Sequence, residues 1–302
     1  MTILKYYLVY SVLYIISLPS FWAMYRISDF FYLILRLIKY RNKVIIENLQ
    51  NSFPNNNNEE NINIRNQFYR HLCDLFVETL KLMSVSAKTI QKRVQIENIE
   101  YLNNAFGQNR DVIAVIGHYN NWEWIPVINY QLKALGCAAY HPLKDQTMDK
   151  VILKLRSLFN SYNIPLKSTN RRILKLKKEG TRYVLGLISD QSPGFISIQY
   201  KMKFLNQTTP VLLGAEKLAK LTNDIVVFFE MHKVRRGYYK LKVVPLFENP
   251  KETKQYEITK THVKHLEKLI IEKPQYWLWS HRRWKFSTIT KEEFERQNLN
   301  AN

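Results

Sequence analysis

Three short apolar segments, separated by longer stretches with a helical pattern, constrain the fold of this chain more than any other feature. They are DVIAVIGH at 111–118, CAAYHPL at 137–143 and TRYVLGLISD at 181–190. Short apolar runs bounded by polar residues are typical of strands that are buried on both faces, as in parallel sheets. The alternation of strand and helix therefore predicts an α/β fold with a mostly parallel central sheet flanked by helices.

The remaining elements follow from the same pattern. Two further strands are expected in DIVVFFEMHKV and YYKLKVVPLF, after residue 223. Helices are expected at 44–53, 59–84, 121–135, 147–162, 171–179 and 210–221, and in a C-terminal segment that ends near Pro274. No internal repeat divides the chain.

The N-terminal segment has the length of a membrane anchor. Twenty uncharged residues lie between Lys5 and Arg26, enough to cross about 30 Å of hydrocarbon. Serines, tyrosines and Pro19 make the segment less apolar than a typical span, so a tilted anchor and a half-inserted helix are both open. The patch FFYLIL at 30–35 is too short to span, and the basic residues after it favour a cytoplasmic location for the rest of the chain. We therefore expect a membrane anchor and interfacial segment over 1–40.

Charge and cysteine content narrow the partners and the compartment. The chain has 45 basic and 25 acidic residues, a formal net charge of +20, which indicates an anionic partner such as a membrane surface, an acidic carrier or a nucleic acid. Cys73 and Cys137 are the only cysteines, too few for a disulfide framework, and they favour a reducing compartment. The sequence contains no recognised metal, phosphate-loop or dinucleotide motif, so we expect neither a metal nor a cofactor.

Candidate catalytic residues follow the first buried strand, in GHYNNWEW at 117–124. His118 and Glu123 are too far apart around a helix to form a helical metal pair, but they can converge at a strand-to-helix turn. Such turns lie at the carboxyl edge of an α/β sheet, where these folds place their sites. A neutral imidazole can accept a proton from a hydroxyl, and a carboxylate can fix its tautomer. A structural alternative stays open, in which Asn120 caps a helix and Glu123 occupies the capping-box position.

The motif resembles a known family. GHYNNWE is similar to the GHxGNWE signature of the lipid A biosynthesis acyltransferases, which belong to the lysophospholipid acyltransferase superfamily. Matching segments keep the family's order: RNKVIIENLQNSFP at 41–54, YHPL at 140–143, SDQSP at 189–193, FLNQTTPVLLGAEKLA at 204–219 and WLWSHRRWK at 277–285. The sequence departs at Asn120, where the family usually has glycine, and at His141, where it has arginine. Asparagine tolerates unusual backbone angles better than most residues.

The resemblance implies an acyltransferase domain over 41–302, with His118 as the general base and Glu123 as its partner. It implies an acyl carrier protein thioester as the donor, a hydroxyl of a lipid A precursor as the acceptor, and the bacterial inner membrane as the location, with the catalytic domain facing the cytoplasm. Arg156, Arg171, Asp190 and Gln191 are the expected substrate-binding residues. Arg156 and Arg171 can also belong to solvated helix faces, and Asp190 can cap a turn.

Other functions stay open at this stage. An acyltransferase of the same fold can act on another lipid, such as a lysophospholipid, an aminolipid or a pigment. A non-enzymatic basic protein that binds a membrane surface or a nucleic acid is the third possibility, although no recognised nucleic-acid motif accompanies the charge and we expect no nucleic-acid partner. The absence of a Gly-x-Ser-x-Gly motif argues against a covalent serine mechanism and favours direct attack on the thioester. In WLWSHRRWK, the tryptophans and arginines can alternatively be interfacial residues that bind lipid headgroups.

Overall fold

A central sheet of seven strands organises the protein. In the computed structural model, which describes residues 2–288, these strands lie in the order β1-β9-β8-β2-β5-β3-β4. Their bounds are β1 Val94–Glu97, β2 Val112–Ile116, β3 Leu135–Tyr140, β4 Tyr162–Pro165, β5 Tyr183–Ile188, β8 Ile225–Arg235 and β9 Tyr238–Phe247. All neighbours pair in parallel except β8 and β9, which form an antiparallel hairpin. The predicted mostly parallel α/β fold is confirmed.

The central strand β2 shows why the sheet is buried on both faces. All five of its residues are buried. Ile113 and Val115 contribute to one hydrophobic core, whereas Val112, Ala114 and Ile116 contribute to the other. Side chains alternate along a strand, so a continuous apolar run supplies both cores at once. This arrangement leaves only the strand ends exposed for a site.

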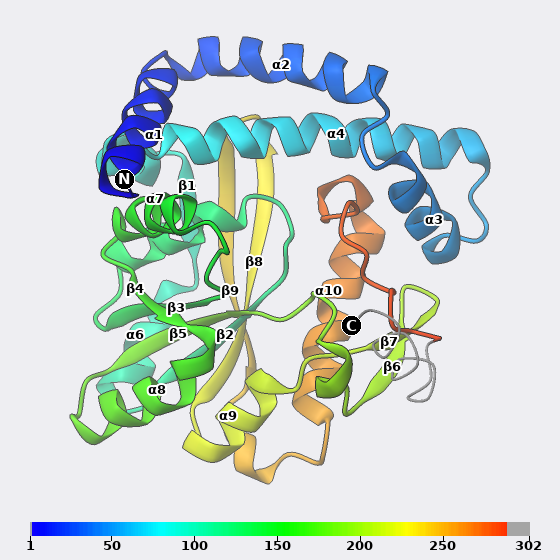
Figure 1. The fold of residues 1–302 in the computed structure, drawn as a ribbon. Coiled ribbons are helices and arrows are strands. Elements are labelled where there is room, and N and C mark those ends of the chain that lie inside the picture. Colours follow the sequence, from blue (N-terminus) through cyan, green and yellow to red (C-terminus); the bar gives the residue numbers. More distant parts are fainter. Residues whose placement is uncertain (1, 289–302) are drawn as a thin grey trace.

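Helices cover the two faces of the sheet (Figure 1). The core on one face receives side chains from α8 (Thr169–Lys178), α9 (Gly214–Thr222) and α10 (Glu257–Glu272). The other core receives them from α6 (Ile99–Gly107), α7 (Gln146–Ser157) and the 3-10 helix η1 (Trp122–Tyr130). The long helix α4 (Asn58–Lys81) crosses one end of the sheet, and α3 (Asn42–Ser52) and the short α5 (Ala87–Gln91) lie before and after it in the chain.

Several local predictions need correction. The segment expected to be helical at 121–135 forms η1, a 3-10 helix that contains Pro126, whose missing backbone donor is incompatible with a regular α-helix interior. The helix expected at 210–221 begins only at Gly214, because Pro210 ends β7 (Gln207–Pro210), which forms an antiparallel hairpin with β6 (Lys201–Phe204). Strands β1 and β4 were not expected; they are only four residues long.

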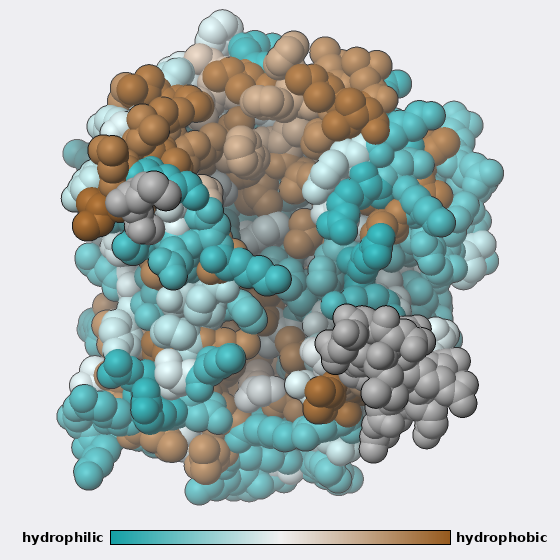
Figure 2. Space-filling model, in the orientation of Figure 1, coloured by the Kyte–Doolittle hydropathy of each residue, from teal (hydrophilic) through white to brown (hydrophobic). Residues whose placement is uncertain are grey.

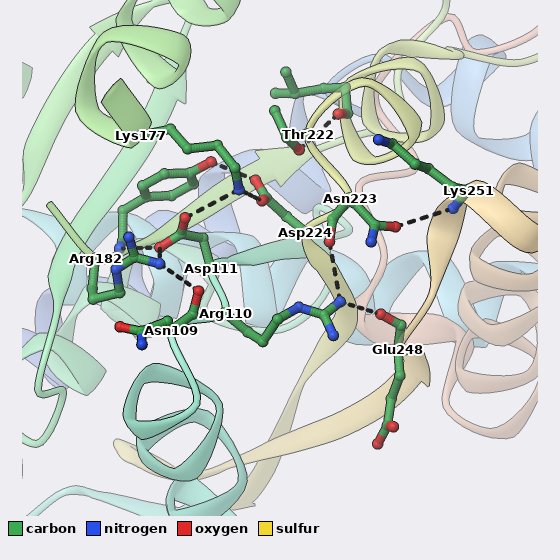
Figure 3. A network of polar contacts seen from close by, with 12 residues as sticks. Asn109, Arg110, Asp111, Lys177, Arg182, Thr222, Asn223, Asp224, Glu248 and Lys251 are labelled. Atoms are coloured by element: carbon green, nitrogen blue, oxygen red, sulfur yellow. Dashed lines mark hydrogen bonds and ion pairs between the residues drawn. The ribbon is translucent and has the colours of Figure 1, made fainter. Parts of the chain in front are cut away.

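Charged groups pair at the edge of the sheet opposite the predicted site. Asp111 and Asp224, whose side chains are fully buried, precede β2 and β8 and both contact Lys177, at 3.2 and 2.5 Å. Arg182 contacts Asp111 at 3.3 Å, and the Tyr183 hydroxyl donates to Asp224 (Figure 3). Burial raises the pKa of Asp111 although both cations oppose the shift. This network ties three neighbouring strands together at their amino ends.

Two helices at the N-terminus lie over α4. Helices α1 (Thr2–Ser17) and α2 (Phe21–Leu37) meet at an angle of 104°. Within residues 2–288, neither helix alone is long and apolar enough to cross a membrane, whereas the bent pair together passes that test by length and composition. The single anchoring helix expected between Lys5 and Arg26 is therefore two shorter helices.

Candidate active site

His118 and Asp190 meet at the carboxyl edge of the sheet. Ile116 on β2 is paired with Ile188 on β5, so His118 and Asp190 each lie two residues beyond neighbouring positions. The Nδ1 atom of His118 is 2.6 Å from Oδ1 of Asp190, and the His118 backbone N–H donates to Oδ2 at 2.9 Å. Trp277 Nε1 donates to the same Oδ2 at 2.8 Å. The Asp190 carboxylate therefore holds one edge of the imidazole, and three hydrogen bonds, two from His118 and one from Trp277, hold the carboxylate in place.

The electrostatics assign a tautomer to His118. Burial alone would raise the pKa of Asp190, but the charge of His118 and the hydrogen bonds from His118 and Trp277 outweigh it and lower that pKa to about 2. Asp190 is therefore an anion that accepts a hydrogen bond from Nδ1–H. The other ring nitrogen, Nε2, lies 3.3 Å from the Gln191 amide nitrogen, which can donate to it. Nε2 thus carries the lone pair, the arrangement that a general base requires.

Glu123 has different partners from those expected. It accepts bonds from Arg156 at 2.9 and 3.2 Å and from Trp122 Nε1 at 3.1 Å. The Trp122 ring lies edge-on to the His118 ring, with centroids 5.1 Å apart. The carboxylate that touches the imidazole is therefore Asp190, and Glu123 reaches His118 only through Trp122. The catalytic role of Glu123 stays a prediction.

The loop between β2 and η1 has an unusual backbone that its neighbours hold in place. Asn120 adopts φ 54°, a left-handed conformation that asparagine tolerates, and this explains how it stands where glycine was expected. Its amide side chain donates to Met231 O at 2.8 Å, and its backbone N–H donates to Tyr276 O at 2.9 Å. The residue that caps η1 is Asn121, whose side chain accepts from Trp124 N at 3.2 Å. The capping alternative therefore placed the cap one residue too early.

An apolar cavity of about 80 Å³ lies beside this loop. Trp122, Glu123 and Arg156 line it together with aliphatic side chains from β2, β3, β5 and η1. Gly136 and Gly186 lie on its wall, where a Cβ at Gly186 would approach Ile116 Cδ1 to 3.2 Å. The ion pair of Glu123 and Arg156, with side chains 19% and 24% exposed, places polar atoms on an otherwise apolar wall. Such a cavity suits a hydrocarbon chain with a polar end.

The structure brings together some of the predicted binding residues and separates others. Asp190 and Gln191 contact His118, and Arg156 lines the cavity. Arg171 is exposed on α8 and does not line that cavity. Among the described residues no cluster of three or more His, Cys, Asp or Glu side chains could hold a metal ion.

Much of the closing segment WLWSHRRWK lies in the interior, although Arg282 is exposed. Trp277, Trp279 and Arg283 are at most 2% exposed, so they do not meet lipid headgroups. The contact of Trp277 with Asp190 was not predicted; the tryptophans in this segment were the available signal, because a buried indole N–H needs an acceptor. Burial lowers the pKa of Arg283 to about 10, although Asp190 opposes the shift.

Comparison with known proteins identifies the family of this chain. Two curated relatives are each 25% identical to this chain over 249 residues, which cover 82% of this chain and 80% of the relative. One is a lipid A biosynthesis palmitoleoyltransferase from Escherichia coli (strain K12), and the other is a lipid A biosynthesis acyltransferase from Shigella flexneri. The family model of the bacterial lipid A biosynthesis acyltransferases matches residues 1–286. This chain belongs to the bacterial lipid A biosynthesis acyltransferase family.

Proposed function

We propose that this protein transfers a fatty acyl chain from an acyl carrier protein thioester to a hydroxyl of a lipid A precursor. Family membership supports acyl transfer to lipid A. The observation that carries the proposal is the His118–Asp190 pair at the carboxyl edge of the sheet, with the His118 ring edge-on to Trp122, which lines an apolar cavity. A base and an apolar cavity are the two parts that such a reaction needs.

The proposed chemistry begins with the acceptor hydroxyl near His118 Nε2. The imidazole takes the hydroxyl proton as the oxygen attacks the thioester carbonyl carbon, and Asp190 stabilises the imidazolium that forms. The tetrahedral intermediate collapses by breaking its carbon–sulfur bond. The departing thiolate takes the proton from the imidazolium, which leaves an ester, a free carrier thiol and a neutral His118. Asp190 stays ionised throughout, in keeping with its lowered pKa.

The cavity is the proposed site of the acyl chain. Its aliphatic walls exclude water from the hydrocarbon, and the ion pair of Glu123 and Arg156 gives it a polar boundary. Arg156 is also a candidate donor to the thioester oxygen as charge develops there. In this arrangement Glu123 orients Arg156 and Trp122, and through Trp122 it restricts the imidazole.

The location that we propose is the bacterial inner membrane, with the catalytic domain facing the cytoplasm. Figure 2 shows apolar side chains gathered over the two N-terminal helices. Trp22 is 70% exposed, Phe30 61% and Leu37 81%, although α2 also packs on α4. A face of this kind can lie in the membrane interface with the polar domain beneath it. The positive net charge suits both anionic lipids and an acidic carrier protein.

Acyl-transfer assays with purified protein test the proposal. The wild-type protein is given an acyl carrier protein thioester and, in separate reactions, a lipid A precursor, a lysophospholipid or an aminolipid. We expect an ester on the lipid A precursor by mass spectrometry, and a loss on the order of 10²–10⁴-fold with His118→Ala. Product on another lipid alone would assign a different acceptor. Full activity of a folded His118→Ala protein would exclude the proposed base.

A further inference from the structure

A second cavity, of about 260 Å³, lies on the other side of the catalytic loop. Arg70, His71 and Asp74 on α4 form one wall, with Lys233 at the end of β8, Arg236 in the turn after it and Tyr276 opposite. The mechanism above uses none of these side chains. Their character is cationic, in contrast to the apolar cavity beside Glu123.

Positive charge exceeds negative charge in this cavity. Asp74 pairs with Lys233 at 3.1 Å and with Arg236 at 2.6 Å. Arg236 also contacts Asp29 on α2 at 2.8 Å. The remaining cation, Arg70, stacks on the Tyr32 ring at 4.8 Å and has no carboxylate partner among residues 2–288. A dianionic ligand would find one unpaired guanidinium and two further cations that are already positioned.

His71 is a second and independent sign of a ligand. Its side chain is 4% exposed and lines the cavity, yet neither ring nitrogen makes a hydrogen bond of normal geometry. A buried polar group without a partner is costly and needs an explanation. Burial and the charge of Lys233 lower the pKa of His71 to about 3, although Asp74 and the Asn120 backbone oppose the shift. The neutral ring keeps one N–H, and the ring contacts the backbone of Asn120 in the loop that carries His118.

Residues that line the cavity contact both the loop that carries His118 and helix α2, which bears the exposed apolar face. Tyr276 contributes its ring to the cavity, edge-on to His71 at 4.9 Å, and its carbonyl accepts the backbone N–H of Asn120 in the catalytic loop. On the other side, Arg236 bonds to the Tyr25 carbonyl and to Asp29 of α2. An anionic headgroup in this cavity would therefore lie between the apolar face and the loop that carries His118.

We infer that this cavity binds a phosphate monoester of the lipid acceptor and so positions the acceptor hydroxyl for His118. This inference rests on the proposed function, because it assigns a part of the substrate of that reaction. Arg70 supplies two parallel N–H donors that match phosphate oxygens, and Lys233 supplies a further cationic donor beside the buried His71 ring. The same phosphate chemistry occurs in bulk anionic phospholipids and in free phosphate, so the experiment separates these sources.

The experiment compares a phosphorylated lipid A precursor with its dephosphorylated counterpart as acceptors. The wild-type protein should prefer the phosphorylated acceptor, and Arg70→Gln should lower that preference about tenfold, the worth of one charge-assisted hydrogen bond. The loss should lie mainly in KM, since the contact is made equally in the ground state and the transition state. Arg70→Lys should restore part of it. Arg235→Gln is the matched control, because Arg235 is an exposed neighbour on β8 that stacks on Tyr238 and does not line the cavity.

Two further measurements distinguish the lipid acceptor from free phosphate and bulk phospholipid as the ligand. They also separate the phosphate site from the proposed acyl-transfer function. Titration of the wild-type protein with inorganic phosphate should shift the ring proton resonances of His71, and Arg70→Gln should abolish the shift. This measurement does not depend on acyl transfer. If the protein acylates neither acceptor, the proposed function is contradicted, but the His71 titration still shows whether the cavity binds phosphate. An unchanged acceptor preference in Arg70→Gln overturns the inference. If that variant instead loses only its sedimentation with phosphatidylglycerol vesicles, the site serves bulk phospholipid and the assignment to the acceptor is wrong.

Discussion

At the scale of single residues, the main question is which carboxylate serves His118. Asp190 is 2.6 Å from Nδ1, whereas Glu123 contacts Arg156 and Trp122. A partner that acts only by orienting the imidazole has nothing left to do once the imidazole is removed. The two candidates can therefore be separated by combining each substitution with the loss of His118.

We expect Asp190→Asn to lower the acyl-transfer rate by about 10²–10⁴-fold, because an amide in place of the carboxylate favours the wrong tautomer. Glu123→Gln should lower it less. In a His118→Ala background, Asp190→Asn should cost little more. Turnover numbers of the single and double variants measure this, with melting temperatures to confirm folding. Additive losses for Asp190→Asn would mean that Asp190 does not act through His118. A non-additive Glu123→Gln loss larger than that of Asp190→Asn would restore the pairing expected from the motif.

At the scale of elements, α1 and α2 are part of the fold as well as a candidate membrane contact. Lys81 of α4 donates to the carbonyls of Ser17, Leu18 and Pro19, at 2.8, 3.2 and 2.8 Å. These bonds satisfy carbonyls that the end of α1 leaves free. Met24 and Tyr25 of α2 are buried against α4. Deletion of the whole segment would therefore uncover core residues, so single substitutions on its exposed face are the sharper test.

The exposed apolar face should provide much of the membrane affinity. The triple substitution Trp22→Ser, Phe30→Ser and Leu37→Ser should lower binding to phospholipid vesicles by tenfold or more, because burial of each such side chain is worth about 1.5–3 kcal/mol. Vesicle sedimentation measures the change. The control is Leu221→Ser with Ile271→Ser, which are 56% and 58% exposed on α9 and α10. Equal losses in both variants would argue against a membrane face at α2.

At the scale of the whole molecule, buried histidines set the response to acid. Burial lowers the pKa of His71 to about 3 and of His262 to about 4, against about 6.5 in an unfolded chain. Below pH 6.5 the unfolded chain binds protons that the folded protein does not, so the free energy of unfolding falls as the pH drops toward 4. Each histidine contributes at most about 1.4 kcal/mol per pH unit.

Melting temperatures measured between pH 7 and pH 4 should show this loss. His262→Gln should make the decline shallower, since it removes one of the groups that protonate only on unfolding. His141→Gln is the control, because His141 is exposed. A slope that His262→Gln leaves unchanged would show that this histidine is protonated in the folded protein.

The net charge of +20 predicts a salt effect on the donor. Activity with a carrier-bound thioester should fall as salt rises, because the Debye length shrinks from about 10 Å at 0.1 M to about 3 Å at 1 M. An uncharged short thioester should be affected less. Steady-state rates with the two donors over a salt series measure the difference. Equal sensitivity would remove the electrostatic argument for a carrier protein.

The sequence by itself determined the class of the fold and the location of the candidate catalytic histidine. Buried runs such as 111–118 and 181–190 depend on local apolar content, so the order of strands and helices follows from the chain alone. The motif that carries His118 is contiguous, and the family resemblance rests on contiguous motifs in order. By contrast, the short strands β1 and β4 carry too little pattern to distinguish them from loops.

Only the tertiary structure decided which side chains face His118. Asp190 is 72 residues away in sequence, and it reaches the imidazole because β2 and β5 are neighbours in register. Strand order and register are long-range properties that local pattern does not encode. Glu123 likewise has a long-range partner, because its carboxylate contacts Arg156 on α7, 33 residues away in sequence. Motif spacing indicated where the candidate site lies, and packing between distant segments selected the contacts of its residues.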